Sequence, residues 1–241
     1  MEITKKKGIN GSELKYIAIL AMLIDHIAWA FIPLDTPLAQ IMHFIGRITA
    51  PIMCFFLTEG FHYTRNFGRY LGRMGIFAVI SHFAFSYFMS GQLIGYSVSS
   101  MISTLALCLV TLWLINKKEL EVYWKLPLLV LVASLAQKCD WGANAVLFTV
   151  AFELARGNRK NQLLSFSAVA LITYVLSGVG VLFKDPGYFL STQIFRLGIF
   201  LSVPLLMLYN GERGGGKATK WIFYVFYPAH LFALGYIYFN Y

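Results

Sequence analysis

Apolar residues gather along the chain in nine long stretches that short polar connections separate. An apolar run of about 18 or more residues with few charges is typical of a helix that spans a membrane, because about 20 residues cover the bilayer core. The pattern therefore predicts an all-α, polytopic transmembrane helical bundle, with residues 1–241 forming a single domain. The predicted spans are Leu14–Ile32, Ile41–Phe61, Met74–Ser90, Val98–Ile115, Leu126–Ala136, Ala143–Leu154, Leu163–Phe183, Ile194–Tyr209 and Trp221–Tyr238.

Two of these predicted spans, Leu126–Ala136 and Ala143–Leu154, are shorter than the rest. Either they cross the bilayer as two short spans, or they form a re-entrant pair. Composition supports the membrane assignment for the whole chain, because 58% of the residues are hydrophobic and only 13% are charged. In soluble domains, by comparison, about a quarter of all residues are charged.

The placement of basic residues predicts the orientation of the chain. Of the 20 Lys and Arg residues, sixteen lie in alternate connections, and only Lys138 and Lys184 lie in the others. Cytoplasmic loops carry the Lys/Arg excess in inner-membrane proteins. We therefore expect a multi-pass protein of the bacterial cytoplasmic membrane, with a cytoplasmic N-terminus and, after nine crossings, a C-terminus outside. The same bias accounts for most of the net charge of +9, so the lipid bilayer is the expected partner and no nucleic acid is needed.

Ionisable residues within the predicted spans are the candidates for function, because such residues are costly in a membrane and face the bundle interior. They are Asp25, His26, Arg47, His82, Arg196 and His230, with Glu59 near a span end. From the rise of about 1.5 Å per helical residue, the three histidines fall near the middle of the membrane, and Arg47 lies at a depth close to that of Asp25.

The adjacent pair Asp25-His26 has two interpretations. Asp25 is a buried counter-ion for Arg47, a role that is compatible with a catalytic neighbour, or it orients and charges His26. His26 is either a packing histidine or a general base, since imidazole titrates near physiological pH. For His82 and His230 an interhelical hydrogen bond is an equally good explanation.

Several basic residues at the predicted cytoplasmic side could hold an anion. Lys15 and His26 are eleven residues apart, about three helical turns, so they share one helix face. Arg65, Arg69 and Arg73 have the spacing i, i+4, i+8, which places them on one stripe if the segment is helical. Arginine is suited to bidentate phosphate contacts, although the positive-inside bias alone would place basic residues here.

Other motifs indicate little chemistry. Cys54, Cys108 and Cys139 have no spacing typical of a disulfide framework or a zinc site, and no metal site is predicted. The segment GERGGGKA lacks the Ser/Thr and the preceding strand of a P-loop. The segment CDWG places Asp140 in a predicted outer loop, where it could meet an acceptor or cap a helix.

Four segments resemble the TraX family: LKYIAILAMLIDHIAWAF, IGRITAPIMCFFLTEGFHYTRNFGRYLGR, DWG and WIFYVFYPAHL. The named member of that family is associated with N-acetylation of conjugative pilin. The spacing of a basic residue and a histidine in the first span is also similar to integral-membrane acyltransferases that modify surface glycans. This resemblance implies a catalytic His26, an acyl-CoA contact at Lys15, corresponding arginines at Arg69 and Arg73, and a terminal family histidine at His230.

The expected function is transfer of an acetyl group from cytoplasmic acetyl-CoA to an amine or hydroxyl acceptor, a pilin N-terminus or a cell-surface glycan. In this hypothesis Lys15, Arg65, Arg69 and Arg73 hold the CoA phosphates. His26 is the general base, Asp25 orients and charges it, and Arg47 or another buried donor stabilises the oxyanion. The alternatives are a small proton-coupled transporter with Asp25, His82 and His230 as a relay, and a non-catalytic scaffold.

Overall fold

The computed structural model describes residues 7–216 and 219–241, and within those ranges it holds helices and no strand. The prediction of an all-α fold is therefore confirmed. The helical segments are α1 (Gly11–Phe31), α2 (Pro37–Gly46), α3 (Thr49–Tyr63), α4 (Phe67–Ser90), α5 (Met101–Asn116), α6 (Val122–Ala136), α7 (Gly142–Leu154), α8 (Arg159–Ala170), the π-helix η1 (Leu171–Leu176), α9 (Ser177–Lys184), α10 (Pro186–Thr192), the 3-10 helix η2 (Ile194–Leu201), α11 (Ser202–Met207) and α12 (Thr219–Asn240).

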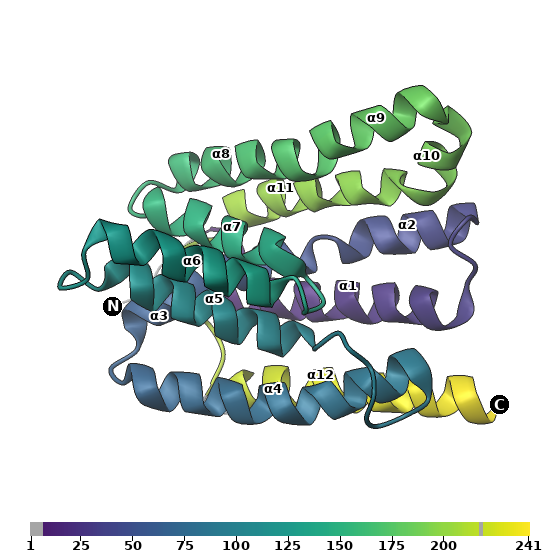
Figure 1. Cartoon of the computed structure of the whole chain (residues 1–241), viewed down its shortest axis with the longest axis horizontal. Helices are drawn as coiled ribbons and strands as arrows, with labels where there is room; N and C mark the ends of the chain where they lie inside the picture. Colours follow the sequence, from purple (N-terminus) through teal and green to yellow (C-terminus); the bar gives the residue numbers. More distant parts are fainter. Residues whose placement is uncertain (1–6, 217–218) are drawn as a thin grey trace.

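Five stretches among the described residues are long and apolar enough to cross a membrane. They are α1, α2 with α3, α4, α8 through α9, and α12. A sixth crossing results if α10 and the η2–α11 segment, which meet at 49°, form one span. The chain is thus a multi-pass membrane protein, while the count of nine spans stays a prediction. The C-terminal ends of α1 and α12 lie at the same end of the molecule (Figure 1).

The remaining helices α5, α6 and α7 are short, with 16, 15 and 13 residues. Figure 1 shows them side by side along one half of the length of α4. The turn between α6 and α7 therefore lies near the middle of the bundle, which favours the re-entrant alternative for this pair. Beyond that turn the long helices continue without cover from α5–α7, and this leaves room for a cavity.

The register of α1 explains why Asp25 and His26 are adjacent. Asn10 caps the helix by accepting from the backbone of Ser12 and Glu13, both at 3.0 Å, and Glu13 accepts from the Asn10 backbone in return. Successive residues of a helix point about 100° apart. Asp25 therefore faces α2 while His26 faces α12, and both side chains are buried.

The second predicted span is interrupted by a turn at residues 47 and 48, between α2 and α3. Arg47 follows α2 directly and its backbone amide donates to the carbonyl of His43 at 3.1 Å. Gly46 permits the close approach of α2 to α1, because a Cβ at this position would overlap the side chain of Asp25. The interruption thus sets the Arg47 side chain directly beside Asp25.

Candidate functional site

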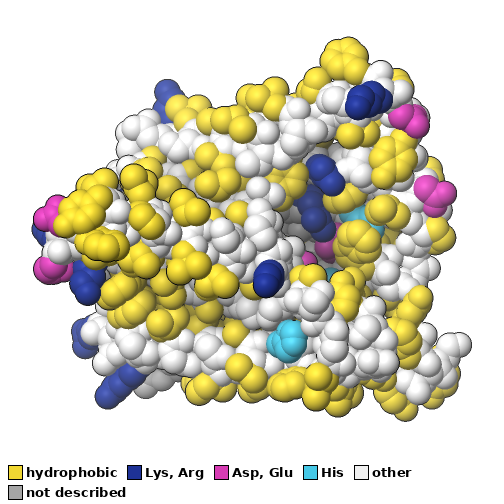
Figure 2. Space-filling model, in the orientation of Figure 1, with side chains coloured by type: hydrophobic (Ala, Val, Ile, Leu, Met, Phe, Trp, Pro, Cys, Tyr) yellow, Lys and Arg dark blue, Asp and Glu magenta, His cyan; other side chains and the backbone are white. Residues whose placement is uncertain are grey.

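A cavity of about 540 Å³ lies where the short helices end. Its walls come from α1, the α2–α3 turn, α4, the α6–α7 turn, η1 and η2. Figure 2 shows a hollow on one face of the molecule in which basic, acidic and histidine side chains meet among apolar ones. Asp25, His26, Arg47, Asp140 and Arg196 all line the cavity. It therefore gathers most of the ionisable residues that the sequence places within the membrane.

Asp25 forms the anionic centre of a compensated cluster. Arg47 Nη2 donates to both carboxylate oxygens of Asp25, at 2.9 and 2.7 Å, and His43 Nδ1 lies 2.8 Å from Oδ1. The predicted ion pair between Asp25 and Arg47 is therefore present. His43 is a residue that the sequence analysis missed, although its i, i+4 spacing to Arg47 places both on one face.

His26 pairs with His230 and not with Asp25. Its Nδ1 lies 2.8 Å from Nε2 of His230, and Nδ1 of His230 lies 2.8 Å from the carbonyl oxygen of Phe226. The expectation that Asp25 orients the His26 ring is corrected, because His43 and Arg47 occupy the Asp25 carboxylate on the other side of α1. His230 on α12 takes the orienting role.

The two hydrogen bonds fix the tautomer of both neutral rings. A carbonyl oxygen only accepts, so Nδ1 of His230 carries the proton and its Nε2 must accept. Nδ1 of His26 is then the donor, which leaves Nε2 of His26 without a proton. His26 thus presents an unprotonated ring nitrogen while its side chain lines the cavity.

Asp140 lies in the loop between α6 and α7, as predicted, and this loop lines the cavity. The chain folds back after α4, and Asp140 donates its backbone amide to Ser99 at 2.9 Å. The Asp140 side chain is exposed to the cavity. Partial desolvation by the cavity walls raises its pKa to about 6; the nearby charge of Arg47 lowers the pKa and that of Asp25 raises it.

His82 stands apart from the histidine pair. It does not line the cavity, and its Nδ1 is buried without a hydrogen-bond partner among the described residues. The predicted relay of Asp25, His82 and His230 is not formed, since Asp25 bonds to α2 and His230 to α1. No observation therefore favours the transporter hypothesis.

The predicted phosphate-binding residues lie at the other end of α1, outside the cavity. The Lys15 ammonium lies 5.7 Å from the ring centre of Phe223, and the Arg73 guanidinium lies 5.4 Å from that of Tyr224. Lys15 and Arg73 therefore flank α12 at neighbouring positions. The structure brings these two predicted residues together but separates them from His26 by three turns of α1.

Arg213 joins this basic cluster and was not predicted. It lies close enough to act electrostatically on both Lys15 and Tyr70. Within residues 7–216 and 219–241, no acidic side chain forms an ion pair with Lys15, Arg73 or Arg213. We call these three residues the basic cluster.

Arg65 and Arg69 lie outside the basic cluster. Helix α4 begins only at Phe67, after the capping residue Asn66, so Arg65 is not helical and the predicted stripe of three arginines is wrong. Arg69 and Arg73 do share a helix, but Arg65 and Arg69 are exposed while Arg73 is half-buried.

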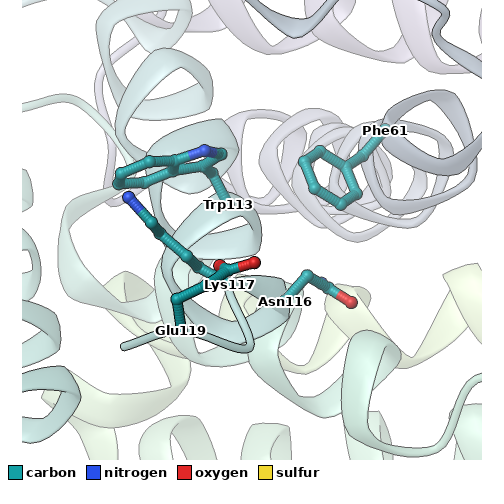
Figure 3. Close-up of a pocket in the computed structure, with 5 residues that line it drawn as sticks. All are labelled: Phe61, Trp113, Asn116, Lys117 and Glu119. Atoms are coloured by element: carbon teal, nitrogen blue, oxygen red, sulfur yellow. The ribbon is translucent and has the colours of Figure 1, made fainter. Parts of the chain in front are cut away.

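A second pocket, of about 260 Å³, lies at the ends of α3 and α5. Figure 3 shows Phe61 and Trp113 on either side of it, with Asn116, Lys117 and Glu119 nearby. None of the predicted site residues lines it. Since Asp25, His26 and Arg47 line the larger cavity, we place the candidate site there.

The described residues contain no group of three His, Cys, Asp or Glu side chains arranged to hold a metal ion. The fold and site together define a polytopic helical membrane protein with a buried histidine pair beside a carboxylate–guanidinium pair. Residues 10–238 match the TraX protein family, and the chain therefore belongs to it, as the sequence resemblance predicted.

One relative is similar over almost its full length. It is the probable fimbrial assembly protein FimC, serogroup H1, of Dichelobacter nodosus, which is 33% identical over 236 residues. The alignment covers 95% of this chain and 96% of that protein. No solved structure gives a significant match.

Proposed function

We propose that the protein is an acetyltransferase of the bacterial cytoplasmic membrane that transfers an acetyl group from acetyl-CoA to an amine or hydroxyl acceptor. The acceptor is a fimbrial or pilin subunit, or a cell-surface glycan. The hydrogen-bonded pair of His26 and His230 carries this proposal, because it leaves a proton-accepting nitrogen on His26, a residue that lines the cavity. The relative named as a fimbrial assembly protein supports a pilin-type acceptor.

In the proposed reaction His26 acts as the general base. Its Nε2 takes the proton from the acceptor nitrogen or oxygen as that atom bonds to the acetyl carbonyl carbon. The carbon–sulfur bond then breaks, and His26 returns the proton to the leaving CoA sulfur. His230 stabilises the imidazolium, because its Nε2 lone pair accepts from Nδ1 of His26.

Arg47 is the proposed donor to the developing oxyanion. Asp25 occupies only the Nη2 group of Arg47, so other N–H groups of the guanidinium remain. The Arg47 side chain keeps 25% of its surface exposed while it lines the cavity. The Asp25 contact fixes its orientation before the reaction, which is the condition under which such donors are most effective.

The basic cluster of Lys15, Arg73 and Arg213 is the proposed site for the CoA phosphates. Its three cations lack acidic partners among the described residues and so can accept an anionic ligand. Lys15 and His26 are separated by about 16 Å along α1. In this proposal the extended arm of the donor follows α1 from the basic cluster to His26, with Arg65 and Arg69 at the outer edge.

The experiment is to incubate the purified protein with radiolabelled acetyl-CoA and follow bound donor, CoA release and label transfer. We expect saturable binding that Arg73→Gln weakens, with slow CoA release even without acceptor. Lys125→Gln is a matched control, because Lys125 lies in α6, outside both the cavity and the basic cluster. Absence of donor binding in the folded wild-type protein would overturn the proposal.

A further inference from the structure

Arg196 is a cation of the cavity wall that the proposed reaction does not use. It lies in η2, in a stretch that the sequence predicts to cross the membrane, and its half-buried side chain lines the cavity. Among the described residues its guanidinium group has neither an ion pair nor a hydrogen bond. An unpaired arginine is costly within a membrane, and ionisable residues at such depth mark ligand sites.

Helix η2 is held in place from its other side, against α2. The backbone amide of Phe195 donates to Oε1 of Gln40 at 3.3 Å, and a Cβ on Gly198 would overlap the backbone of Phe44. A 3-10 helix has three residues per turn, so Phe195 and Gly198 lie on one face. Arg196 lies on the neighbouring face, and its direction toward the cavity is therefore set by the packing of η2 on α2.

The hydroxyl group of Tyr174 lies within electrostatic reach of Arg196. Tyr174 belongs to the π-helix η1 and lines the cavity, and the charges of both Arg196 and Arg47 act on it. Asn144 donates to Oη of Tyr174 at 3.4 Å, so the Tyr174 hydroxyl proton is not used in that bond. Short π-helical turns within longer helices are frequent at functional sites. Arg196 and Tyr174 thus both offer N–H or O–H donors to an anionic ligand.

The other charges of the cavity wall do not compensate Arg196. The carboxylate of Asp25 is already bonded to Arg47 and His43. Asp140 forms no ion pair with Arg196, and the charges that act on Asp140 are those of Arg47 and Asp25. One cation therefore remains at this wall for a ligand with a single negative charge.

A carboxylate is the anionic group that matches these donors. It carries one charge, and its two oxygens accept two parallel N–H bonds from a planar guanidinium. A phosphate monoester carries a charge of about −1.5 to −2 at pH 7, which exceeds that of one cation. A phosphodiester has a single charge, but it extends substituents on two sides, whereas a carboxylate ends a chain and can face a wall.

We propose that Arg196 and the Tyr174 hydroxyl bind a carboxylate group of the acceptor, so that the cavity selects acceptors that carry one. This inference rests on the proposed function and deepens it by naming an anionic group that the acceptor presents. Coenzyme A has phosphate groups but no carboxylate, so the acceptor is the reactant that supplies it.

The test is calorimetric titration of 3-phenylpropionate and its neutral analogue 3-phenylpropanamide into the full-length protein in detergent, without acetyl-CoA. The phenyl ring matches the aromatic wall that Trp29, Phe88 and Trp141 contribute to the cavity. At about pH 7.5 the carboxylic acid is ionised. We expect the wild-type protein to bind the acid about tenfold or more tightly than the amide, the ratio typical of hydrogen bonds to a charged group.

Arg196→Gln should remove this preference, and Tyr174→Phe should reduce it. Lys184→Gln should keep it, because Lys184 is an exposed cation outside the cavity. Arg73→Gln should keep it as well, because the basic cluster lies outside the cavity. Size-exclusion profiles identify variants that fail to fold, and Arg196→Gln alters a side chain without a hydrogen bond or ion pair among the described residues.

Equal affinity of the wild-type protein for the acid and the amide would overturn the inference, as would an unchanged preference in folded Arg196→Gln. A preference lost in Arg73→Gln but not in Arg196→Gln would place the probe in the basic cluster and overturn it too. If 3-phenylpropionate does not bind but phosphatidylglycerol is retained only with Arg196 present, a lipid headgroup replaces the carboxylate. Selectivity through Arg196 in a protein that never binds acetyl-CoA would instead overturn the proposed function and leave the carboxylate site.

Discussion

Nδ1 of His26 on α1 lies 2.8 Å from Nε2 of His230 on α12, although 204 residues separate them in the chain. This contact and the bond from His230 to the Phe226 carbonyl together determine which nitrogen of His26 is free. The bond joins α1 to α12 and satisfies both buried rings. In the proposed function it also leaves Nε2 of His26 available as a base.

The first prediction concerns His230 as a positioning residue. His230→Phe removes the acceptor for Nδ1 of His26, so the ring loses its tautomer preference, and transfer should fall by about 10²-fold. His230→Gln should retain more activity, because its amide oxygen can accept the same hydrogen bond. Initial rates at saturating donor check this, and rescue by Gln distinguishes orientation from simple packing. Equal rates in the Phe variant and the wild type would contradict the role.

The second prediction concerns the ion pair of Asp25 and Arg47. Asp25→Asn or Arg47→Gln leaves one buried charge unpaired, and each should lower the free energy of unfolding by about 3–5 kcal/mol. The double variant should recover much of that loss, because neither charge remains. Thermal melting in detergent measures all four proteins. If the losses of the single variants simply add in the double variant, the two residues do not stabilise the fold as a pair.

The third prediction concerns the approach of α2 to α1. Gly46→Ala places a methyl group against the side chain of Asp25 and should destabilise the protein by about 1–3 kcal/mol, the usual cost of overpacking. Gly72→Ala is the matched control, since its added methyl group meets no atom within 4 Å. That variant should be neutral or slightly more stable, because alanine favours a helix. A melting temperature that is equal in Gly46→Ala and Gly72→Ala would contradict the close approach.

Sequence patterns predicted the all-helical fold and, within the candidate site, the ion pair of Asp25 and Arg47. The number of residues along each predicted helix was enough to predict that Asp25 and Arg47 lie at a similar depth in the membrane. The two residues belong to consecutive helical segments joined by a short connection. The same counting placed His230 near His26 in depth. It could not show that α12 packs against α1, so the contact between the two rings was not predicted.

The errors have a common physical origin. Hydrophobic stretches indicate that a segment lies in the membrane but not how far it crosses, so the sequence left two alternatives for residues 126–154, two full spans or a re-entrant pair. The short lengths of α6 and α7 were the available signal. His43 was overlooked although it lies four residues before Arg47, and Arg213 joins Lys15 only through tertiary packing.

The general-base role of His26 is the central claim, and transfer by His26→Ala tests it most directly. The account predicts that this variant folds, binds acetyl-CoA like the wild type and transfers acetyl about 10²–10⁴-fold more slowly. His82→Ala, which alters a histidine outside the cavity, should transfer at the wild-type rate. A His26→Ala protein that acetylates its acceptor at the wild-type rate would contradict the account.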